Sequence, residues 1–275
     1  GNLVREVTIR RGDASPTAPV VVSLEFEVGM QDQAFLGPES GLAVPAEDGG
    51  VDLYVATQWL HVDQAQVCRV LGLPPEKVRL TLAGVGGAFG GKIALHGEAV
   101  AVRLSEKCGR PMKLVLTREE VLQGGSGPAA GAMIDVRVAA DSNGKLTAIE
   151  GTYYMDAGGL PGMSPSLLMQ ASAALYQCPN LKLEGYDVVT NKPRTEAYRG
   201  PGGIQAAFAV EQAMDILCQR LSMDPLEFRK RNASVTGSLM PIGTPFPTIG
   251  LTDILEAFGR HPCWTEPLQP GKHPR

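Results

Sequence analysis

The sequence predicts an α+β protein in which mixed sheets are flanked by helices, and three observations support this class. Residues 3–10 and 19–28 alternate apolar and polar side chains, as half-buried strands do. A long hairpin is indicated where residues 133–139 and 146–155 flank a polar turn, and the strongest helical periodicity comes later in the chain. The most glycine-rich segment is not followed by repeated βα units, which argues against a doubly wound parallel sheet.

The first half of the chain is expected to mix strands and helices. The two N-terminal strands are expected to pair with each other, and residues 29–50 mix glycine, proline and acidic residues as a loop does. The further elements predicted here are a strand at 51–56, a helix at 60–71 that stops at Gly72, a strand at 78–82 and a helix at 95–107 that stops at Gly109.

The second half contains the hairpin and the longest helix. That helix follows Gly203, and its predicted apolar stripe is Ala207, Val210, Met214, Leu217 and Leu221. The other elements predicted here are a strand at 112–117, a helical turn at 118–123, a flexible segment at 124–131, a helix at 167–176, a strand at 181–190, and helices from Asp224-Pro225 to Arg231 and at 252–258.

Composition is that of an ordinary globular protein, large enough for one large domain or two small ones. Of 275 residues, 44% are hydrophobic and 20% are charged. A net charge of -4 and a pI near 5.7 provide no basic surface for nucleic acid, and no apolar run is long enough to span a bilayer. We therefore expect neither a nucleic-acid partner nor a membrane.

Cysteine and histidine patterns predict no metal bound by side chains. The five cysteines contain no C-x-x-C pair, and the four histidines form no H-E-x-x-H or similar pattern. Reduced thiols are expected, which is consistent with a cytoplasmic location. The tripeptide Arg11-Gly12-Asp13 matches an adhesion motif, but a turn between strands is the expected role.

A first glycine loop, residues 84–92, has the sequence GVGGAFGGK and is predicted to join a strand to a helix. Glycine allows close backbone approach and exposes N–H groups, so the loop can bind phosphate or an oxyanion. Residues Gly86 to Lys92 also resemble a P-loop, but Ile93 replaces the required Ser or Thr. A P-loop-like nucleotide-binding domain is the alternative function, and a tight turn without a ligand is the structural alternative.

A second glycine loop, residues 195–203, has the sequence TEAYRGPGG and opens the long helix. Most lone arginines form surface ion pairs. Arg199, however, lies in a glycine turn that begins a helix, as the first loop is predicted to do. We interpret the two loops as parts of one ligand site.

Together, Thr57-Gln58, the first loop from Gly86 to Lys92 and the second loop from Ala197 to Gly203 resemble the molybdenum-binding subunit of the xanthine dehydrogenase and aldehyde oxidase family. The resemblance extends over most of the chain, including the segments 37–45 and 224–229. It implies that the ligand is the molybdenum–pterin cofactor, as molybdopterin or its cytosine dinucleotide. No side chain then needs to bind the metal.

The resemblance also implies the site residues. Gln58 would donate a hydrogen bond towards an oxygen ligand of the metal, and Arg199 would lie at the cofactor and substrate face, so both are catalytic candidates. Gly87, Phe89 and Gly90 would line the cofactor with backbone. The family hydroxylates electron-poor carbon with water as the oxygen source, and the cofactor carries the reaction.

Two positions depart from the purine-oxidising members, which have a glutamate in place of Ile93 and an aromatic residue in place of Pro201. Isoleucine cannot hydrogen-bond a purine edge, and proline offers no aromatic face for stacking. We expect an aldehyde or another N-heterocycle as the small-molecule substrate. The second loop also lacks the cysteine of the carbon monoxide oxidising branch.

The resemblance implies a larger assembly. Residues 1–235 are expected to form the first cofactor-binding domain, and 236–275 a connection towards a second one in the remaining C-terminal part of the subunit. That part would hold the glutamate general base, so this fragment is expected to be inactive alone, with Glu98, Glu119 and Glu120 structural or solvated. Iron–sulfur clusters and FAD are expected on other domains or subunits, in a higher oligomer.

Overall fold

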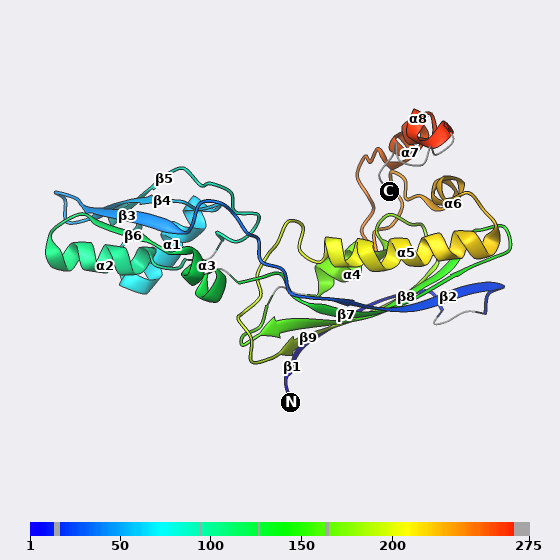
Figure 1. The fold of residues 1–275 in the computed structure, drawn as a ribbon, viewed down its shortest axis with the longest axis horizontal. Helices are drawn as coiled ribbons and strands as arrows, with labels where there is room; N and C mark the ends of the chain where they lie inside the picture. Colours follow the sequence, from blue (N-terminus) through cyan, green and yellow to red (C-terminus); the bar gives the residue numbers. More distant parts are fainter. Residues whose placement is uncertain (14–16, 94, 126, 163–164, 267–275) are drawn as a thin grey trace.

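The computed structural model describes residues 1–13, 17–93, 95–125, 127–162 and 165–266. The molecule is elongated and consists of two lobes, each with its own sheet (Figure 1). We call the lobe with the five-stranded sheet the larger lobe and the one with the four-stranded sheet the smaller lobe. Each has a separate apolar core, and the expected α+β class with mixed sheets is confirmed.

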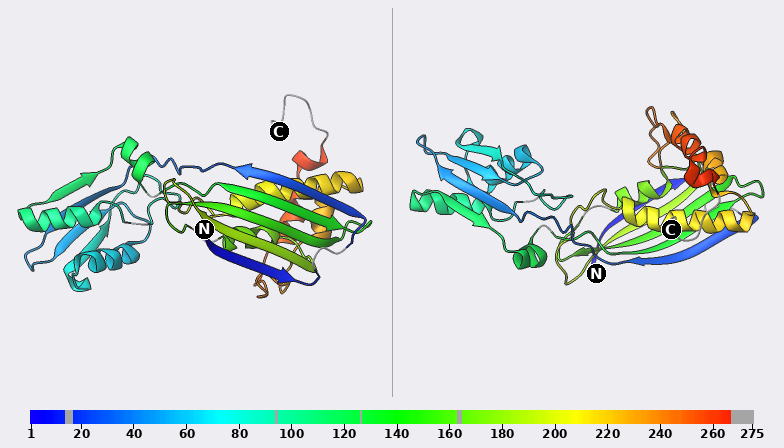
Figure 2. Two further views of the ribbon diagram at one scale, coloured as in Figure 1. Left: turned by 90° about the horizontal axis from the view of Figure 1, so that it is seen from below. Right: turned by 45° about the horizontal axis from the view of Figure 1, so that its top comes forward.

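The larger lobe is a sheet with helices on one face. Its strand order is β1-β9-β8-β7-β2, and β8 and β9 are parallel while the other neighbours are antiparallel. Helices α4 and α5 cover one face, leaving the other open (Figure 2). The bounds are β1 Leu3–Arg11, β2 Val20–Val28, β7 Ala132–Ala140, β8 Leu146–Gly158, β9 Asn180–Val189, α4 Ser166–Ala173 and α5 Gly203–Leu221.

The smaller lobe has the strand order β5-β4-β3-β6, with β4 and β5 parallel. Helices α1 and α2 pack on one face, and Val67 and Val102 join Leu53 in a fully buried core. The bounds are β3 Ser40–Pro45, β4 Val51–Val55, β5 Val78–Leu82, β6 Met112–Val115, α1 Leu60–Leu71, the 3₁₀ helix η1 Pro75–Lys77, α2 Glu98–Cys108 and α3 Arg118–Gly124.

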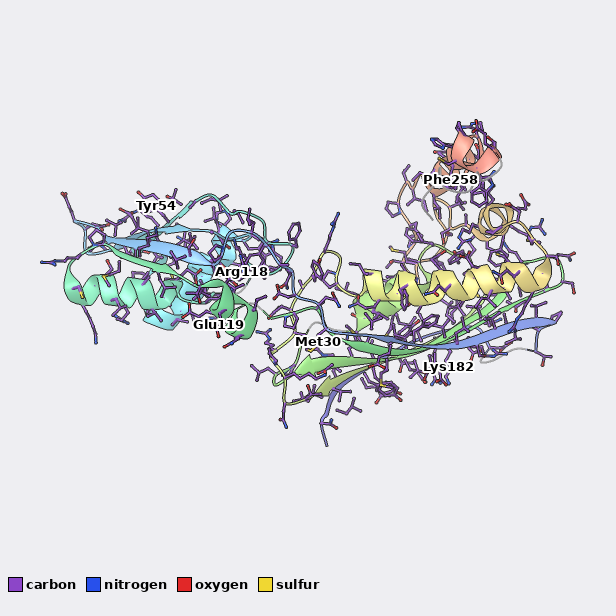
Figure 3. The ribbon with its side chains drawn as sticks, viewed as in Figure 1. Met30, Tyr54, Arg118, Glu119, Lys182 and Phe258 are labelled. Carbon is purple, nitrogen blue, oxygen red and sulfur yellow. The ribbon has the colours of Figure 1, made fainter. Side chains whose placement is uncertain are left out.

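Two segments connect the lobes: a crossing segment, residues 29–39, and a return segment, of which residues 125 and 127–131 are described. They are bridged where Ala129 N donates to Gln31 O at 2.8 Å. Figure 3 shows Met30 on the crossing segment, with Arg118 and Glu119 of α3 at the near end of the smaller lobe. The two segments that connect the lobes are therefore bonded to each other through their backbones.

Several helix ends follow from local sequence. Gly72 takes the left-handed conformation that ends α1. The Asp224 side chain accepts from two backbone N–H groups at the start of α6, and Thr117 and Glu120 form a capping box on α3. The helices beyond α5 are α6 Pro225–Asn232, α7 Leu251–Gly259 and α8 Pro262–Thr265.

Long-range pairing overturns two expectations. The two N-terminal strands do not pair with each other, because β1 lies at one edge of the five-stranded sheet beside β9 and β2 at the other edge beside β7. Residues 29–50 are not all loop, because β3 lies between β4 and β6 in the smaller sheet. In contrast, the predicted β7–β8 hairpin is confirmed.

Helix boundaries and phases were also partly wrong. Helix α2 begins at Glu98, so residues 93–97 separate its first turn from the first glycine loop. The carboxylate at that turn belongs to Glu98, the first residue of α2, which accepts a hydrogen bond from His96 N at 2.7 Å. On α5 the predicted stripe is correct at Val210, but Ala207 is exposed and Ala206 is buried.

Candidate functional site

The two glycine loops meet at the junction between the lobes. Arg199 N donates a hydrogen bond to Phe89 O at 2.9 Å. Beside this bond, a Cβ on Gly90 would lie 2.4 Å from Ala197 O, so only glycine allows the approach. The predicted convergence of the loops is therefore confirmed.

Both loops hold strained backbone at the point of contact. Phe89 has φ +55° and Arg199 has φ +35°, values that non-glycine residues rarely adopt. Each such residue costs on the order of 1–3 kcal/mol and persists where surrounding structure enforces it, often at functional sites. Both side chains remain exposed, so the strain is not explained by burial.

Gln58 is attached to the first loop in a defined orientation. It follows β4, and one side-chain atom accepts from Gly90 N at 2.9 Å and from Lys92 N at 3.2 Å. Because two N–H donors converge on that atom, it must be the amide oxygen Oε1. Gln58 is exposed, and the Nε2 group of its amide is left as the donor atom of the side chain.

Lys92 supports the loop from behind. Its Nζ donates to Gly37 O at 2.7 Å and to Val85 O, and it lies 4.7 Å from the centre of the Phe35 ring. Only 2% of the residue is exposed, and burial lowers the pKa of its ammonium group. A P-loop lysine must reach outward to phosphate, so this geometry does not support the nucleotide-binding alternative.

A buried polar cluster lies behind Gln58. Thr57 accepts from Trp59 N at 3.1 Å and donates to Lys92 O at 3.3 Å. Asp63, on α1, is 3% exposed, and burial raises its carboxyl pKa to about 6. Glu98 raises this pKa further, while the Thr57 hydroxyl and His96 oppose the shift.

This cluster predicts a pH-dependent stability. The folded-state pKa of Asp63 lies above its ordinary value of 3.8, so the folded state holds the proton more tightly. The contribution is fully present below about pH 4 and is lost as pH rises through about 6. We expect Asp63→Asn to reduce the fall in unfolding free energy over this window, measured by urea titration at several pH values. An Asp253→Asn control, on exposed α7, should keep the wild-type slope; an unchanged slope in Asp63→Asn would contradict the assignment.

The remaining predicted residues lie on the two loops or directly after the first. Ile93 and Pro201 are half-buried, one directly after Lys92 and the other two residues after Arg199. Gly87 has φ +89° and lies against Phe35 and the Phe89 ring. Within the described ranges no carboxylate lies within ion-pair distance of Arg199.

An open hollow of about 530 Å³ lies beside Gln58. Trp59 contributes to it and is half exposed, so the hollow combines an apolar wall with the amide of Gln58. Its lining is Thr57, Gln58, Trp59, Leu60, His61, Val62 and Leu82.

Among the described residues, neither a side-chain metal centre nor a membrane span is found. In the described part of the chain no cluster of three or more His, Cys, Asp or Glu side chains could hold a metal. Among the helices of the same residues, none combines the length and the apolar character that spanning a bilayer requires.

Sequence reasoning missed one residue of the junction, Gln33 on the crossing segment. Its Nε2 group donates to Ala197 O at 2.8 Å and to Gly127 O at 2.9 Å, and only 3% of the residue is exposed. A single glutamine inside a predicted loop carries no periodic or motif signal. Only the fold reveals its role.

Comparisons with known proteins show the family of the chain. The family model of the molybdopterin cofactor-binding domain matches residues 1–233. The chain is 32% identical to a probable xanthine dehydrogenase subunit of Bacillus subtilis over 95% of this chain and 36% of that protein. It is 30% identical to an aldehyde oxidoreductase of Megalodesulfovibrio gigas over 93% of this chain and 29% of that protein.

Solved structures agree as well. The aldehyde oxidoreductase from Desulfovibrio gigas superposes with a TM-score of 0.83 at 29% identity, over 94% of this chain and 29% of that one. Quinoline 2-oxidoreductase from Pseudomonas putida 86 shares the fold, with a TM-score of 0.88 at 24% identity over 94% of this chain and 35% of that one. The chain thus spans about a third of the length of these proteins. It belongs to the molybdopterin cofactor-binding domain family of the xanthine dehydrogenases and aldehyde oxidoreductases.

Proposed function

We propose that this chain supplies the first half of the cofactor site in a molybdopterin-dependent hydroxylase that oxidises an aldehyde or an N-heterocycle. Residues 1–235 would form the first cofactor-binding domain, and 236–275 the connection to the second. The observation that carries the proposal is the hydrogen bond between Arg199 N and Phe89 O, because it places two strained, glycine-rich loops at one exposed point.

The residues present fit a pterin-borne metal group, in its molybdopterin or cytosine dinucleotide form. On the second loop, a Cβ at Gly200 or Gly203 would meet nothing within 4 Å, so bare backbone there can contact a bulky, flat ligand. The exposed donors are an amide and a guanidinium, which suit oxygen atoms and anionic groups. When bound, the cofactor supplies a redox-active metal centre for hydroxylation with water.

Four side chains would orient the reaction. Gln58 Nε2 would donate to an oxygen of the cofactor, fixed in direction by Gly90 N and Lys92 N. The Arg199 guanidinium would stabilise negative charge that develops on the substrate. Ile93 and Pro201 would give the substrate pocket an apolar wall without purine-recognising groups.

The relatives support this class of substrate but do not identify the substrate itself. They include an aldehyde oxidoreductase and a nicotinate dehydrogenase subunit, and also xanthine dehydrogenases. We further propose that iron–sulfur and flavin domains or subunits complete the electron path, that the rest of the subunit provides the general base, and that the assembly is a cytoplasmic oligomer.

The substrate proposal predicts weak xanthine turnover. The test is a panel of aldehydes, purines and other N-heterocycles assayed on the full-length assembled enzyme, with molybdenum measured per subunit. We expect molybdenum to be present. We also expect kcat/KM for xanthine to be roughly a hundredfold or more below that of the best substrate, because the polar edge of a purine would find no hydrogen-bond partner beside Ile93 and Pro201. Comparable xanthine turnover would overturn the roles given to Ile93 and Pro201, and absence of molybdenum would overturn the function.

A further inference from the structure

The crossing segment contacts both glycine loops. On the first loop, Gly37 N donates to Gly86 O at 2.9 Å and Gly37 O accepts from Lys92 Nζ. On the second loop, Gln33 donates to Ala197 O at 2.8 Å. One stretch of chain between the lobes is thus attached to both sides of the site.

Gln33 commits both of its amide hydrogens to backbone carbonyls in the interior. One goes to Gly127 O on the return segment and the other to Ala197 O, the atom that lies against Gly90. The return segment is itself tied to the second loop, since Glu196 N donates to Pro128 O at 2.9 Å. Removing the Gln33 amide would leave two carbonyls without these donors, and the loss is most costly at Ala197 O, where the hydrogen bond is buried.

The position of Ala197 determines whether the loops can touch. Ala197 is 5% exposed and precedes Arg199 by two residues. If the Ala197 carbonyl shifts, the Arg199 N–H loses its alignment with Phe89 O. The reason is that the backbone between Ala197 and Arg199 is short and is strained at Arg199. Gln33 is therefore connected to Arg199 through Ala197.

We propose that Gln33 is a positioning residue that fixes the second glycine loop against the first and so sets where Arg199 stands relative to Gln58. The consequence for the reaction rests on the proposed function, but the effect on the loops does not. The proposal is a statement about hydrogen bonds within this chain, and it can be measured without a loaded cofactor.

The test is amide hydrogen exchange on the intact protein, resolved at Arg199 and Gly90. In Gln33→Leu we expect the Arg199 amide, which donates to Phe89 O, to exchange about tenfold faster, as loss of one buried hydrogen bond implies. Gln33→Glu keeps the size but not the donors. It should show the same acceleration near neutral pH, and less when acid protonates the carboxyl and restores one donor.

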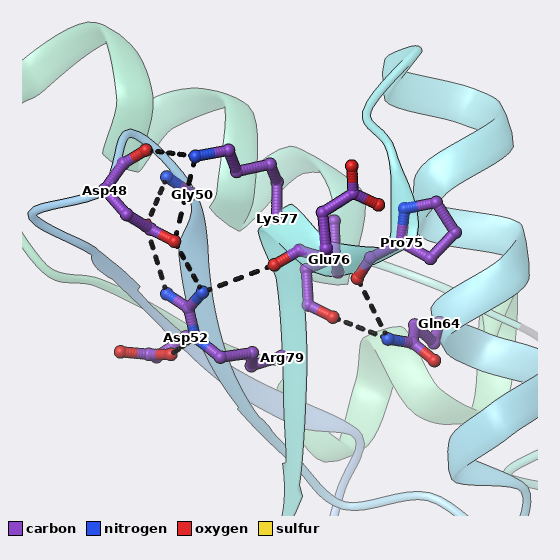
Figure 4. A network of polar contacts seen from close by, with 9 residues as sticks. Asp48, Gly50, Asp52, Gln64, Pro75, Glu76, Lys77 and Arg79 are labelled. Atoms are coloured by element: carbon purple, nitrogen blue, oxygen red, sulfur yellow. Dashed lines mark hydrogen bonds and ion pairs between the residues drawn. The ribbon is translucent and has the colours of Figure 1, made fainter.

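Gln64→Leu is the matched control. The Gln64 Nε2 group also donates to two backbone carbonyls, Pro75 O at 3.3 Å and Val78 O at 2.7 Å, but within the smaller lobe (Figure 4). Its replacement should change Arg199 exchange by less than about twofold. The Gln64→Leu variant therefore distinguishes a local effect of Gln33 on the Arg199 amide from the general effect of removing a side-chain donor.

Two results would overturn the proposal. The first is unchanged Arg199 exchange in both Gln33 variants. The second is an acceleration equal at all amides or equal in Gln64→Leu, which would mean that Gln33 only stabilises the fold. Where Gln33→Leu does not fold, Gln33→Glu decides the question alone. Molybdenum content of the wild-type protein tests the proposed function separately, so failure of one does not imply failure of the other.

Discussion

Replacing Gly90 with alanine is expected to separate the two glycine loops and to remove the cofactor from the protein. The new Cβ would lie 2.4 Å from Ala197 O, and φ at this residue is +105°, so the variant suffers both a clash and backbone strain. We expect a loss of about 2–4 kcal/mol in unfolding free energy. Molybdenum per subunit should fall at least about tenfold, because the site is built from the relative position of the loops.

Gly84→Ala is the control within the same loop. A Cβ at Gly84 meets nothing within 4 Å, and this glycine does not have a positive φ. Its replacement should change the unfolding free energy by less than about 0.5 kcal/mol and leave the molybdenum content intact. Denaturant unfolding and metal analysis of the full-length variants measure both quantities. Wild-type molybdenum in Gly90→Ala would show that the contact of the loops is not needed for binding.

Replacing Gln58 with glutamate should remove activity while leaving the fold intact. A carboxylate can still accept from Gly90 N and Lys92 N, but its second oxygen replaces the outward Nε2 donor. We expect kcat to fall roughly 10²- to 10³-fold, the usual effect of losing one oriented donor. The unfolding free energy should change by less than about 1 kcal/mol.

Gln58→Leu distinguishes the two functions of this side chain. It removes the donor and also the acceptor of the loop amides, so both kcat and stability should fall. Steady-state kinetics on the best substrate and urea unfolding give the two values for each variant. If Gln58→Glu keeps wild-type kcat, the outward amide has no part in the reaction, and Gln58 serves only to shape the loop.

Local chemistry was enough to predict most elements and the two glycine loops. Gly72 ends α1 and Asp224 caps α6, because glycine and aspartate satisfy helix ends within a few residues of themselves. The glycines of the first loop predicted a close backbone contact, and the structure shows one between Gly90 and Ala197 O, while the predicted contact of Gly90 with a cofactor stays a prediction. Such features depend on neighbours in the sequence.

The partner of each contact could not be predicted in this way. Alternation identifies a strand without indicating which strand lies beside it, so the sheet order that places β1 and β2 at opposite edges came only from the fold. The contact partners of Lys92 could not be predicted either. Its sequence context suggested phosphate, but the crossing segment brings the Gly37 carbonyl and the Phe35 ring to it, and it points inward.

The sequence by itself determined that this protein has two glycine loops able to approach a ligand, a glutamine beside the first and an arginine in the second. The convergence of the loops was also predicted, but only the tertiary structure decided that they join through a hydrogen bond from Arg199 N to Phe89 O, and that Gln33 donates to Ala197 O beside it. The physical reason is that a hydrogen bond between residues distant in the chain leaves no periodic pattern in the sequence. It exists only once the two lobes have folded and the segments between them are fixed.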